Sequence, residues 1–475
     1  MNRSGTARNI AVVGAGAAGT LTAIRLLRNA TAEPVPPRVW LIGPGATGRG
    51  LAFGTDVPTH LLNVRAAGMS AHRDDPEHFV RWLADRATGQ DFVPRALFGR
   101  YLADCLEAAR NSAGVGLLVR VHDRVTGVTH HPDRDGAPLT LTLRTGRPVT
   151  VDAAVLALGN LPPDRTWAPP ALRDSPMFLA DPWAPGALDS APHDRDILLV
   201  GTGLTMVDVA LTLRRPARVV HACSRRGLLP RPHVSDPSAI PATPRLDARA
   251  GLPALRRAVL RHLAVCRRVY GDWRSGIDSL RPVTSTLWQQ LPPADQARFL
   301  AEDLRLWEAH RHRIPPASAE ALTDALRAGT VSIGKGHVAD ARPTEGCLDV
   351  TLDDGRTLRV GAVVNCTGCP TDLTRAVDPL ITGLLTTGLA TPAPIGGGFD
   401  TTSSGRLRPA PGHAPAPLWT LGSLRRGNLL ETTAIPEIRC QADDLALTLL
   451  RRDDAMPAGR RNSTGETPRP TMTPR

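Results

Sequence analysis

The sequence predicts an α/β fold made of two similar units, each with a parallel sheet followed by a β-meander. A glycine-rich motif follows a short apolar run twice, as GAGAAG at 14–19 and as GTGLTM at 201–206. A stretch of alternating polar and apolar residues lies downstream of each motif, at 120–160 and 333–369. The chain of 475 residues is also too long for a single hydrophobic core.

Each glycine motif has the flanking elements that a dinucleotide-binding turn requires. The apolar runs at 10–13 and 197–200 read as buried strands, and the residues after each motif place apolar side chains on a helical period. A strand, a glycine turn and a helix in this order are typical of a Rossmann-like nucleotide-binding unit. The sequence therefore predicts two dinucleotide sites in one chain.

The glycines of these motifs have steric roles. Gly14 and Gly201 suit a turn conformation that residues with a Cβ rarely adopt, and Gly16 and Gly203 let the backbone approach a pyrophosphate at a helix N-terminus. Met206 replaces the third glycine of the second motif, at a position that governs helix packing rather than phosphate contact. The residues expected to contact the two pyrophosphates are Gly14, Gly16, Ala17, Ala18 and Gly19, and Gly201, Gly203, Leu204 and Thr205.

The two alternating stretches predict β-meanders. The first turns at Asp135-Gly136 and Thr145-Gly146 and ends in the apolar run VDAAVLALGN, which reads as a buried strand. The second turns at Asp354-Gly355 and ends in VGAVVNCTGC. The same order of elements thus follows both glycine motifs.

This duplicated order resembles the two-dinucleotide-binding-domain flavoproteins, which include glutathione-reductase-like enzymes and the flavin-containing and N-hydroxylating monooxygenases. Further runs resemble a bacterial branch of FAD/NAD(P)-binding proteins. These runs are GRGLAFGT from Gly48, HLLNV from His60, GTGLTMVDVAL from Gly201, SRRGLLP from Ser224, HRHRIP from His310, NCTG from Asn365 and ETTAIPEIR from Glu431. The resemblance implies that the first unit binds FAD and that the second, inserted into the first, binds NADPH or NADH.

The resemblance also divides the chain into domains. We expect the first part of the FAD-binding domain at 1–188, and the NADPH-binding domain at 189–372 with a helical insertion around 250–330. The FAD-binding domain then returns at 373–455. The proline-, threonine- and arginine-rich tail at 456–475 is expected to be disordered.

The second site favours NADPH over NADH. In this fold the residue that ends the second strand lies beside the adenosine ribose, where a carboxylate selects NAD and arginine accommodates the 2′-phosphate of NADP. Here the strand at 218–222 leads into Ser224, Arg225 and Arg226, and no acid is present. The alternative is that both arginines are ordinary solvated side chains.

The first site lacks an acid that flavoproteins of this group normally have. The strand at 39–42 is followed by Gly43, so either backbone and water hold the FAD ribose or the affinity for FAD is reduced. The C-terminal strand at 418–422 resembles the stretch that reaches the flavin ribityl chain, with Ser423 in place of the common Asp. The resemblance implies further FAD contacts at Arg49, Gly422, Thr432 and Thr433.

The run ETTAIPEIR predicts the start of a helix. Thr432 or Thr433 is expected to cap it, Pro436 fits its first turn, and Glu437 is placed to complete a box-like cap. The resemblance implies that this helix points its N-terminus at the flavin, where its dipole would stabilise negative charge on the reduced ring. The alternative is an ordinary capped helix.

The predicted function is an FAD-dependent, NADPH-consuming oxidoreductase. The leading hypothesis within this class is a flavin monooxygenase that hydroxylates a small molecule, such as an amine. Molecular oxygen is the expected electron acceptor, because the pair Cys366 and Cys369 ends a strand, where thiol reactivity is not favoured. His60 and Asn63 are candidate catalytic residues, although they can equally cap a turn and end a strand. Arg274 and Arg281 lie on one face of a predicted helix with Asp278 between them, where they line a substrate pocket or form surface ion pairs.

Two alternative functions stay open. A flavin-linked NADPH dehydrogenase or reductase would use the same cofactor residues without oxygen. A non-catalytic nucleotide-binding redox sensor would tolerate the missing acid at Gly43.

Composition limits the remaining classes of function. The net charge is +12, but arginine supplies almost all of the positive charge and is not interleaved with aromatic residues, so we expect no nucleic-acid partner. No long apolar run and no charged-then-apolar leader is present, and we expect a cytoplasmic protein without membrane contact. His310 and His312 are two residues apart and would not share a helical face, so no metal site is expected.

Overall fold

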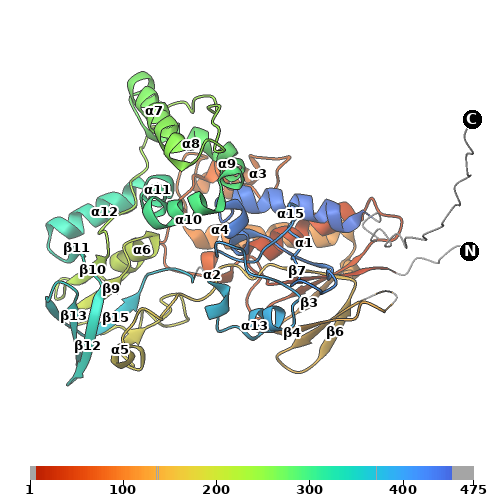
Figure 1. Cartoon of the computed structure of the whole chain (residues 1–475), viewed down its shortest axis with the longest axis horizontal. Coiled ribbons are helices and arrows are strands. Elements are labelled where there is room, and N and C mark those ends of the chain that lie inside the picture. Colours follow the sequence, from red (N-terminus) through yellow and green to blue (C-terminus); the bar gives the residue numbers. More distant parts are fainter. Residues whose placement is uncertain (1–6, 135, 137, 371, 452–475) are drawn as a thin grey trace, which may run out of the picture.

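The computed structural model describes residues 7–134, 136, 138–370 and 372–451. Two separate parallel sheets lie side by side, which confirms the two-unit α/β fold (Figure 1). The strand before the first glycine motif belongs to one sheet and the strand before the second motif belongs to the other. The tail expected to be disordered at 456–475 lies outside the described residues.

The first sheet has the strand order β16-β7-β1-β2-β3, and all its pairs are parallel. Because β16 comes from the end of the chain, the chain returns to the first unit after it has built the second. The strands of the sheet are β1 (Asn9–Val13), β2 (Arg38–Ile42), β3 (Leu118–Val121), β7 (Ala153–Leu156) and β16 (Leu418–Thr420). The accompanying antiparallel meander consists of β4 (Val125–His130), β5 (Leu139–Leu143) and β6 (Pro148–Val151).

Helix α1 (Ala17–Ala30) is the central helix of the first unit. It packs against α4 (Arg95–Ala113) and α15 (Ile435–Leu450), and its apolar face is fully buried in the shared core. The glycine loop that precedes α1 is thereby fixed at the carboxyl edge of the sheet. The other helices of this unit are α2 (Gly50–Phe53), α3 (His78–Leu83), α13 (Pro379–Thr386) and α14 (Arg426–Leu429).

The second sheet repeats this plan with the order β11-β10-β9-β15-β8. Its strands are β8 (Phe178–Leu179), β9 (Ile197–Val200), β10 (Val220–Ser224), β11 (Val331–Lys335) and β15 (Ala362–Asn365), and its meander is β12 (Val338–Thr344), β13 (Cys347–Leu352) and β14 (Thr357–Val360). Helix α6 (Leu204–Leu213) follows the second glycine motif, and the short helix α5 (Pro170–Arg173) packs on β12. Strand β8 already belongs to the second sheet, although it precedes the expected domain boundary at 188.

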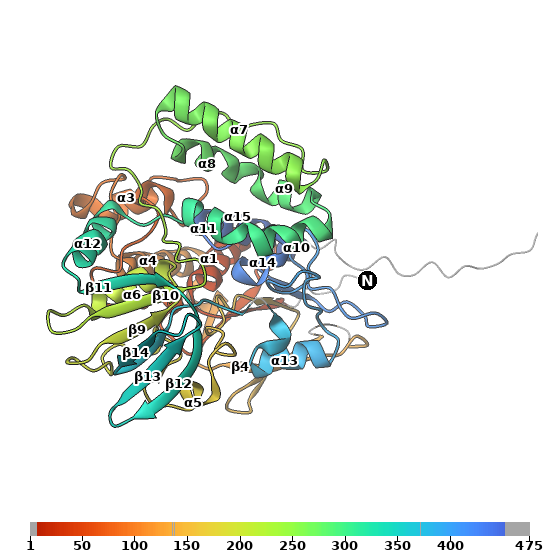
Figure 2. The ribbon, with the colours of Figure 1, turned by 60° about the vertical axis from the view of Figure 1, so that its left-hand side comes forward.

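A helical insertion separates β10 from β11. Its helices are α7 (Leu252–Tyr270), α8 (Arg274–Leu280), α9 (Thr284–Gln290), α10 (Pro293–Glu302), α11 (Leu304–Arg311) and α12 (Pro316–Arg327). Helices α7, α8 and α9 project above the two sheets, with α10 and α11 below them, whereas α12 packs against β11 and α6 (Figure 2). Among the described residues, the structure contains no helix with the length and apolar character needed to cross a bilayer.

Candidate functional site

The first glycine loop is a tight turn that only glycine fits. Gly14 has a φ of +112°, and a methyl group added to it would lie 2.2 Å from the carbonyl oxygen of Ala157, at the end of β7. In contrast, a methyl group added to Gly16 would have only one neighbour within 4 Å, the Cα atom of Gly50 at 3.5 Å. No side chain caps α1, so the amides of its first turn have no side-chain acceptor and can bind an anion such as a pyrophosphate.

The second glycine loop has the same construction. Gly201 has a φ of +107°, and an added methyl would lie 2.4 Å from the carbonyl oxygen of Cys366, at the end of β15. A methyl group added to Gly203 would have only one neighbour within 4 Å, the guanidinium of Arg305 at 3.9 Å. No side chain caps α6. Met206 is fully buried, so α6 packs on its strand through a side chain where α1 uses Gly19.

The structure explains why an acid is missing after β2. A methyl group at Gly43 would lie 2.8 Å from both the backbone nitrogen and the Cβ of Ala15, in the glycine loop. The loop and the end of β2 therefore pack backbone to backbone, and a carboxylate at this position would displace the loop. A ribose bound here has to be held by groups other than a side chain at residue 43.

The C-terminal part of the first unit brings two of the expected FAD residues together. Thr432 donates its hydroxyl to the carbonyl of Gly422 at 3.0 Å, and Gln441 of α15 bonds both residues, at 2.8 Å and 3.1 Å. The neighbouring hydroxyl of Ser423 is buried and has no hydrogen-bond partner among the described residues. A buried hydroxyl without a partner at the position expected to face the ribityl chain fits a bound flavin.

The prediction of a side-chain cap on the last helix is wrong. Helix α15 begins after Ala434, and no side chain caps it. The hydroxyl of Thr432 is engaged by Gly422 and Gln441, Thr433 is exposed, and Glu437 pairs with Arg281 instead of turning back to the helix start. Tertiary contacts thus take the groups that a local cap would use, and the first-turn amides of α15 stay free of side chains.

His60 is a packing residue at the junction of the two units. Its imidazole is buried, with Nδ1 2.7 Å from the hydroxyl of Thr55 and Nε2 2.8 Å from the hydroxyl of Thr212 on α6. It also packs edge-on against Trp183. Burial, aided by the positive charge of Arg95, lowers the pKa of His60 to about 4. Because both ring nitrogens are occupied, the geometry favours the structural alternative for His60.

Asn63 and Arg49 lie in loops of the first unit. The Asn63 carbonyl accepts a hydrogen bond from Nε2 of His233 at 3.0 Å, which ties its loop to the start of the helical insertion. The half-buried Asn63 amide has no partner among the described residues and stays available to a ligand. Arg49 bonds the Gly54 carbonyl and pairs with Asp56, so its guanidinium stabilises its own loop.

Arg274, Asp278 and Arg281 pair with other parts of the chain rather than with one another. Arg274 pairs with Asp272 at 2.9 Å and donates to the carbonyl of Pro232. Asp278 accepts from Arg313, and Arg281 forms a two-point ion pair with Glu437 of α15 at 2.5 and 2.7 Å. The Arg281 pair joins the helical insertion to the first unit.

The three residues after β10 have different surroundings. The hydroxyl of Ser224 bonds Thr202 and the amide of Gly227, and so fixes the loop. Arg226 donates to the carbonyls of Ala301 and Glu302 at the end of α10. Arg225 is exposed and has no partner among the described residues, so it is the arginine free to bind a phosphate.

Two basic residues near this site were missed by the sequence reasoning. Lys335 ends β11 in register with Ser224, and its side chain lies beside Gly227. Arg305 of α11 lies over Gly203 and pairs with Glu308. Lys335 is the one lysine in the sequence, which could have drawn attention to it, whereas nothing local marks Arg305 among many arginines.

A group of potential metal ligands lies in the first unit, away from both glycine loops. The ligand atoms of His72, His78 and Cys105 all lie within 4.8 Å of one another. However, a guanidinium nitrogen of Arg28 lies 2.5 Å from Nδ1 of His72, and the Tyr101 hydroxyl lies 2.8 Å from Nδ1 of His78. The positive charge and the occupied ring nitrogens favour a buried polar network over a cation site.

The C-x-x-C pair contains two free thiols. Burial raises the pKa of the Cys366 thiol, and the carbonyl of this residue packs against Gly201. Cys369 is exposed as a residue, but its thiol donates to the carbonyl of Leu161 at 2.9 Å, and the loss of water around the sulfur raises its pKa. Thiols with raised pKa values are poor nucleophiles, so these cysteines have a structural role.

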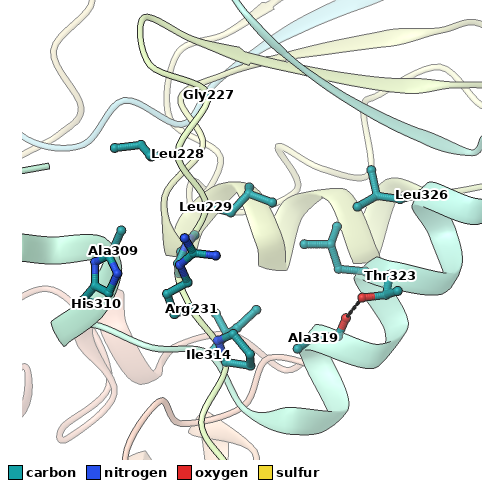
Figure 3. Close-up of a pocket in the computed structure, with 13 residues that line it drawn as sticks. Gly227, Leu228, Leu229, Arg231, Ala309, His310, Ile314, Ala319, Thr323 and Leu326 are labelled. Carbon is teal, nitrogen blue, oxygen red and sulfur yellow. Dashed lines mark hydrogen bonds between the residues drawn. The ribbon is translucent and has the colours of Figure 1, made fainter. Parts of the chain in front are cut away.

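A pocket of about 350 Å³ lies beside the loop at 227–232. Helix α12 forms the other wall, where Thr323 bonds the carbonyl of Ala319, and Leu229 projects between the two walls (Figure 3). The lining is mostly apolar, with Arg231 and His310 as its charged or titratable members. None of the lining residues belongs to a glycine motif, but Gly227, whose amide bonds Ser224, lines the pocket at the end nearer β10.

Comparisons with known proteins agree with this geometry. Residues 11–161 match a family model described as FAD-NAD(P)-binding. No curated protein sequence matches the chain. Among solved structures, an ornithine hydroxylase from Pseudomonas aeruginosa in its reduced form is similar, with a TM-score of 0.62, 14% identity and coverage of 94% of this chain and 99% of that chain.

Two other solved structures match similar fractions of this chain and of their own chains. A cadaverine monooxygenase from Erwinia amylovora, solved with FAD bound, has a TM-score of 0.59, 12% identity and coverage of 99% of this chain and 100% of that chain. A bacillithiol disulfide reductase from Staphylococcus aureus has a TM-score of 0.54, 13% identity and coverage of 94% and 98%. The fold of two-dinucleotide-binding-domain flavoproteins is therefore shared along nearly the whole chain.

Proposed function

We propose that this protein is an FAD-dependent, NADPH-consuming oxidoreductase, because residues 11–161 match the FAD-NAD(P)-binding family model. Within this class we propose a flavin monooxygenase that hydroxylates a small molecule, with an amine as the preferred substrate. FAD is assigned to the first glycine loop and NADPH to the second.

One observation carries the proposal: the chain builds the same open glycine cradle twice. Gly14 lies against the carbonyl that follows β7, and Gly201 lies against the carbonyl that follows β15. Gly16 and Gly203 carry no side chain that would keep a pyrophosphate away from the protein backbone. The unpartnered hydroxyl of Ser423 adds a polar contact on the flavin side. A chain with a single nucleotide would not need the second cradle.

The residues of this chain supply binding and orientation, while bound FAD would supply the redox chemistry, taking a hydride from NADPH and passing electrons to oxygen. The first-turn amides of α1 and α6 would hold the two pyrophosphates. The uncapped N-terminus of α15 and the bonded pair Gly422 and Thr432 would position the flavin edge and stabilise negative charge there. The free amide of Asn63 is the candidate polar contact to the reacting atoms.

The raised pKa values of the thiols of Cys366 and Cys369 favour a monooxygenase over a disulfide reductase. A disulfide reductase of this fold exists, but here Cys366 and Cys369 have raised pKa values and structural contacts. An ornithine hydroxylase and a cadaverine monooxygenase also share the fold, and the substrates in their names are amines. Oxygen as the acceptor and an amine as the substrate support each other in this interpretation.

The test measures flavin, NADPH and oxygen in one preparation. We expect the purified protein to carry a flavin that absorbs at about 450 nm. NADPH and oxygen consumption should rise when an accepted amine is added, with a hydroxylated amine as the product. Reduced flavin that persists in air would identify a reductase, and a protein that binds FAD and NADPH without turnover would identify a redox sensor.

The basic residues at the ends of β10 and β11 predict NADPH specificity. Replacing Arg225 and Lys335 together with alanine is expected to weaken NADP⁺ binding by about tenfold or more, since a charged hydrogen bond contributes about 1.5 to 3 kcal/mol. Binding of NAD⁺, which lacks the 2′-phosphate, should change little. Calorimetric titration of both nucleotides measures the ratio of their two dissociation constants. Arg261→Ala, at an exposed arginine of α7, is the control, and an equal loss for both nucleotides would contradict the assignment.

A further inference from the structure

The guanidinium of Arg305 lies at the opening of the second glycine loop. Arg305 belongs to α11 of the helical insertion, whereas Gly203 is the residue at which α6 begins. Nη2 of Arg305 lies 3.9 Å from the position of a methyl group added to Gly203, and it is the nearest atom there from elsewhere in the chain. The space beside the first turn of α6 is therefore bounded by a cationic side chain of another element.

Arg305 has donors that no protein group takes. Its Nη1 donates to the carboxylate of Glu308 at 2.5 Å, and this is its one side-chain hydrogen bond among the described residues. A guanidinium has several further N–H donors. The side chain of Arg305 is 45% exposed, so the Nη2 group beside Gly203 is open to a ligand. Arg305 can therefore bind an acceptor at the second glycine loop without giving up its ion pair.

Glu308 holds two arginines at this place. Its Oε2 accepts from Arg305, and its Oε1 accepts from Arg426 of α14, in the first unit. Burial alone would raise the pKa of Glu308, but the charges of Arg426 and Arg305 lower it, so the carboxylate stays ionised. Two positive charges share one negative charge, and this ion-paired group keeps one net positive charge.

Two neighbouring acids are already paired with other arginines. Asp208, further along α6, accepts from Arg95 at 2.7 Å. Glu431 lies 3.2 Å from Nε of Arg311 at the end of α11. These carboxylates leave the net positive charge beside Gly203 in place. An anion bound to the first-turn amides of α6 would therefore meet an opposite charge on its other side.

We propose that Arg305 binds the pyrophosphate of NADPH from the side opposite the first-turn amides of α6, so that the helical insertion and the second unit hold the nucleotide between them. The inference rests on the proposed function for the identity of the nucleotide. The planar fork of a guanidinium matches two phosphate oxygens that the amides leave free. Arg225 and Lys335, in contrast, follow β10 and end β11, where the 2′-phosphate is expected.

The test titrates three nucleotides into the FAD-loaded protein by calorimetry. NADP⁺ carries the pyrophosphate and the 2′-phosphate, NAD⁺ lacks the 2′-phosphate, and ADP-ribose also lacks the nicotinamide. Arg305→Ala should weaken the binding of all three by about tenfold or more, because each loses the same charged hydrogen bond. A loss confined to NADP⁺ would place Arg305 at the 2′-phosphate, and a loss that spares ADP-ribose would place it at the nicotinamide. Either result, or unchanged binding, would overturn the assignment.

Two variants separate this contact from a general loss of positive charge. Arg298→Ala is the matched control, because Arg298 of α10 is 49% exposed and also pairs with a glutamate of its own helix. It should leave the three dissociation constants unchanged. Arg305→Lys keeps the charge but loses the fork, so its affinities should lie between those of Arg305→Ala and the unchanged protein. Equal losses in Arg298→Ala and Arg305→Ala would overturn the assignment.

The readouts separate this inference from the proposed function. Binding of these nucleotides needs neither oxygen nor an amine, so it is measured whether or not turnover occurs. An unchanged protein that binds no NADP⁺ would refute the proposed function, and this inference with it. A protein that consumes NADPH and binds all three nucleotides equally well after Arg305→Ala would keep the proposed function and refute this inference alone.

Discussion

Gly201→Ala is expected to weaken NADPH binding at least tenfold while FAD remains bound. The added methyl would lie 2.4 Å from the carbonyl oxygen of Cys366, at a φ of +107° that alanine rarely adopts. The second glycine loop has to shift, at a cost of about 1 to 3 kcal/mol for the backbone alone, and its amides lose their alignment. We expect the dissociation constant of NADP⁺ to rise at least tenfold by calorimetry, with an unchanged flavin spectrum.

The corresponding substitution in the first unit should weaken the binding of FAD instead of NADPH. Gly14→Ala, where the methyl would lie 2.2 Å from the Ala157 carbonyl oxygen, is expected to yield protein with little or no flavin. Gly383→Ala is the matched control, because this glycine lies inside α13 with no atom within 4 Å of an added methyl. Simultaneous loss of both nucleotides in Gly201→Ala, with normal folding, would contradict two independent sites.

Acidification from pH 7 to pH 5 is expected to destabilise the protein through two buried histidines. Burial lowers the pKa of both His60 and His72 to about 4, below the value of about 6.5 in an unfolded chain. The folded state therefore holds both imidazoles neutral. Their stabilisation is complete above pH 6.5 and is lost as the pH falls toward 4, because only the unfolded chain takes up the protons.

The magnitude follows from the size of the pKa difference. Each histidine contributes about 1.4 kcal/mol per pH unit through this window, or about 3 kcal/mol in full. The unfolding temperature measured between pH 7 and pH 5 should fall by several degrees. His60→Gln should reduce this slope, whereas the exposed control His413→Gln should not. An unfolding temperature that is constant across this range would contradict the prediction.

The fold could be predicted because its signals are local. The apolar runs at 10–13 and 197–200 and the turns at Gly14 and Gly201 act within a few residues of one another, and the structure places all of them as expected. Six helices, α7 through α12, lie between β10 and β11. A duplicated local pattern then implies a duplicated architecture.

The site was predicted less completely because it depends on distant contacts. The cap expected from Thr432 is absent since Gly422 and Gln441 engage its hydroxyl, and Arg226 is committed to the end of α10. Lys335 comes to lie beside the proposed NADPH site through the pairing of β10 with β11. No pattern along the chain indicates these partners.

The sequence by itself determined the two glycine cradles, since a positive φ and close backbone contact are properties of the residues in each turn. Only the tertiary structure decided which charged side chains remain free. Arg225, which has no partner among the described residues, differs from its neighbour Arg226 only in what lies across from it, since Arg226 is bonded to the end of α10. The physical reason is that an ion pair or hydrogen bond depends on distance in space, which elements far apart in the chain bring about when they pack.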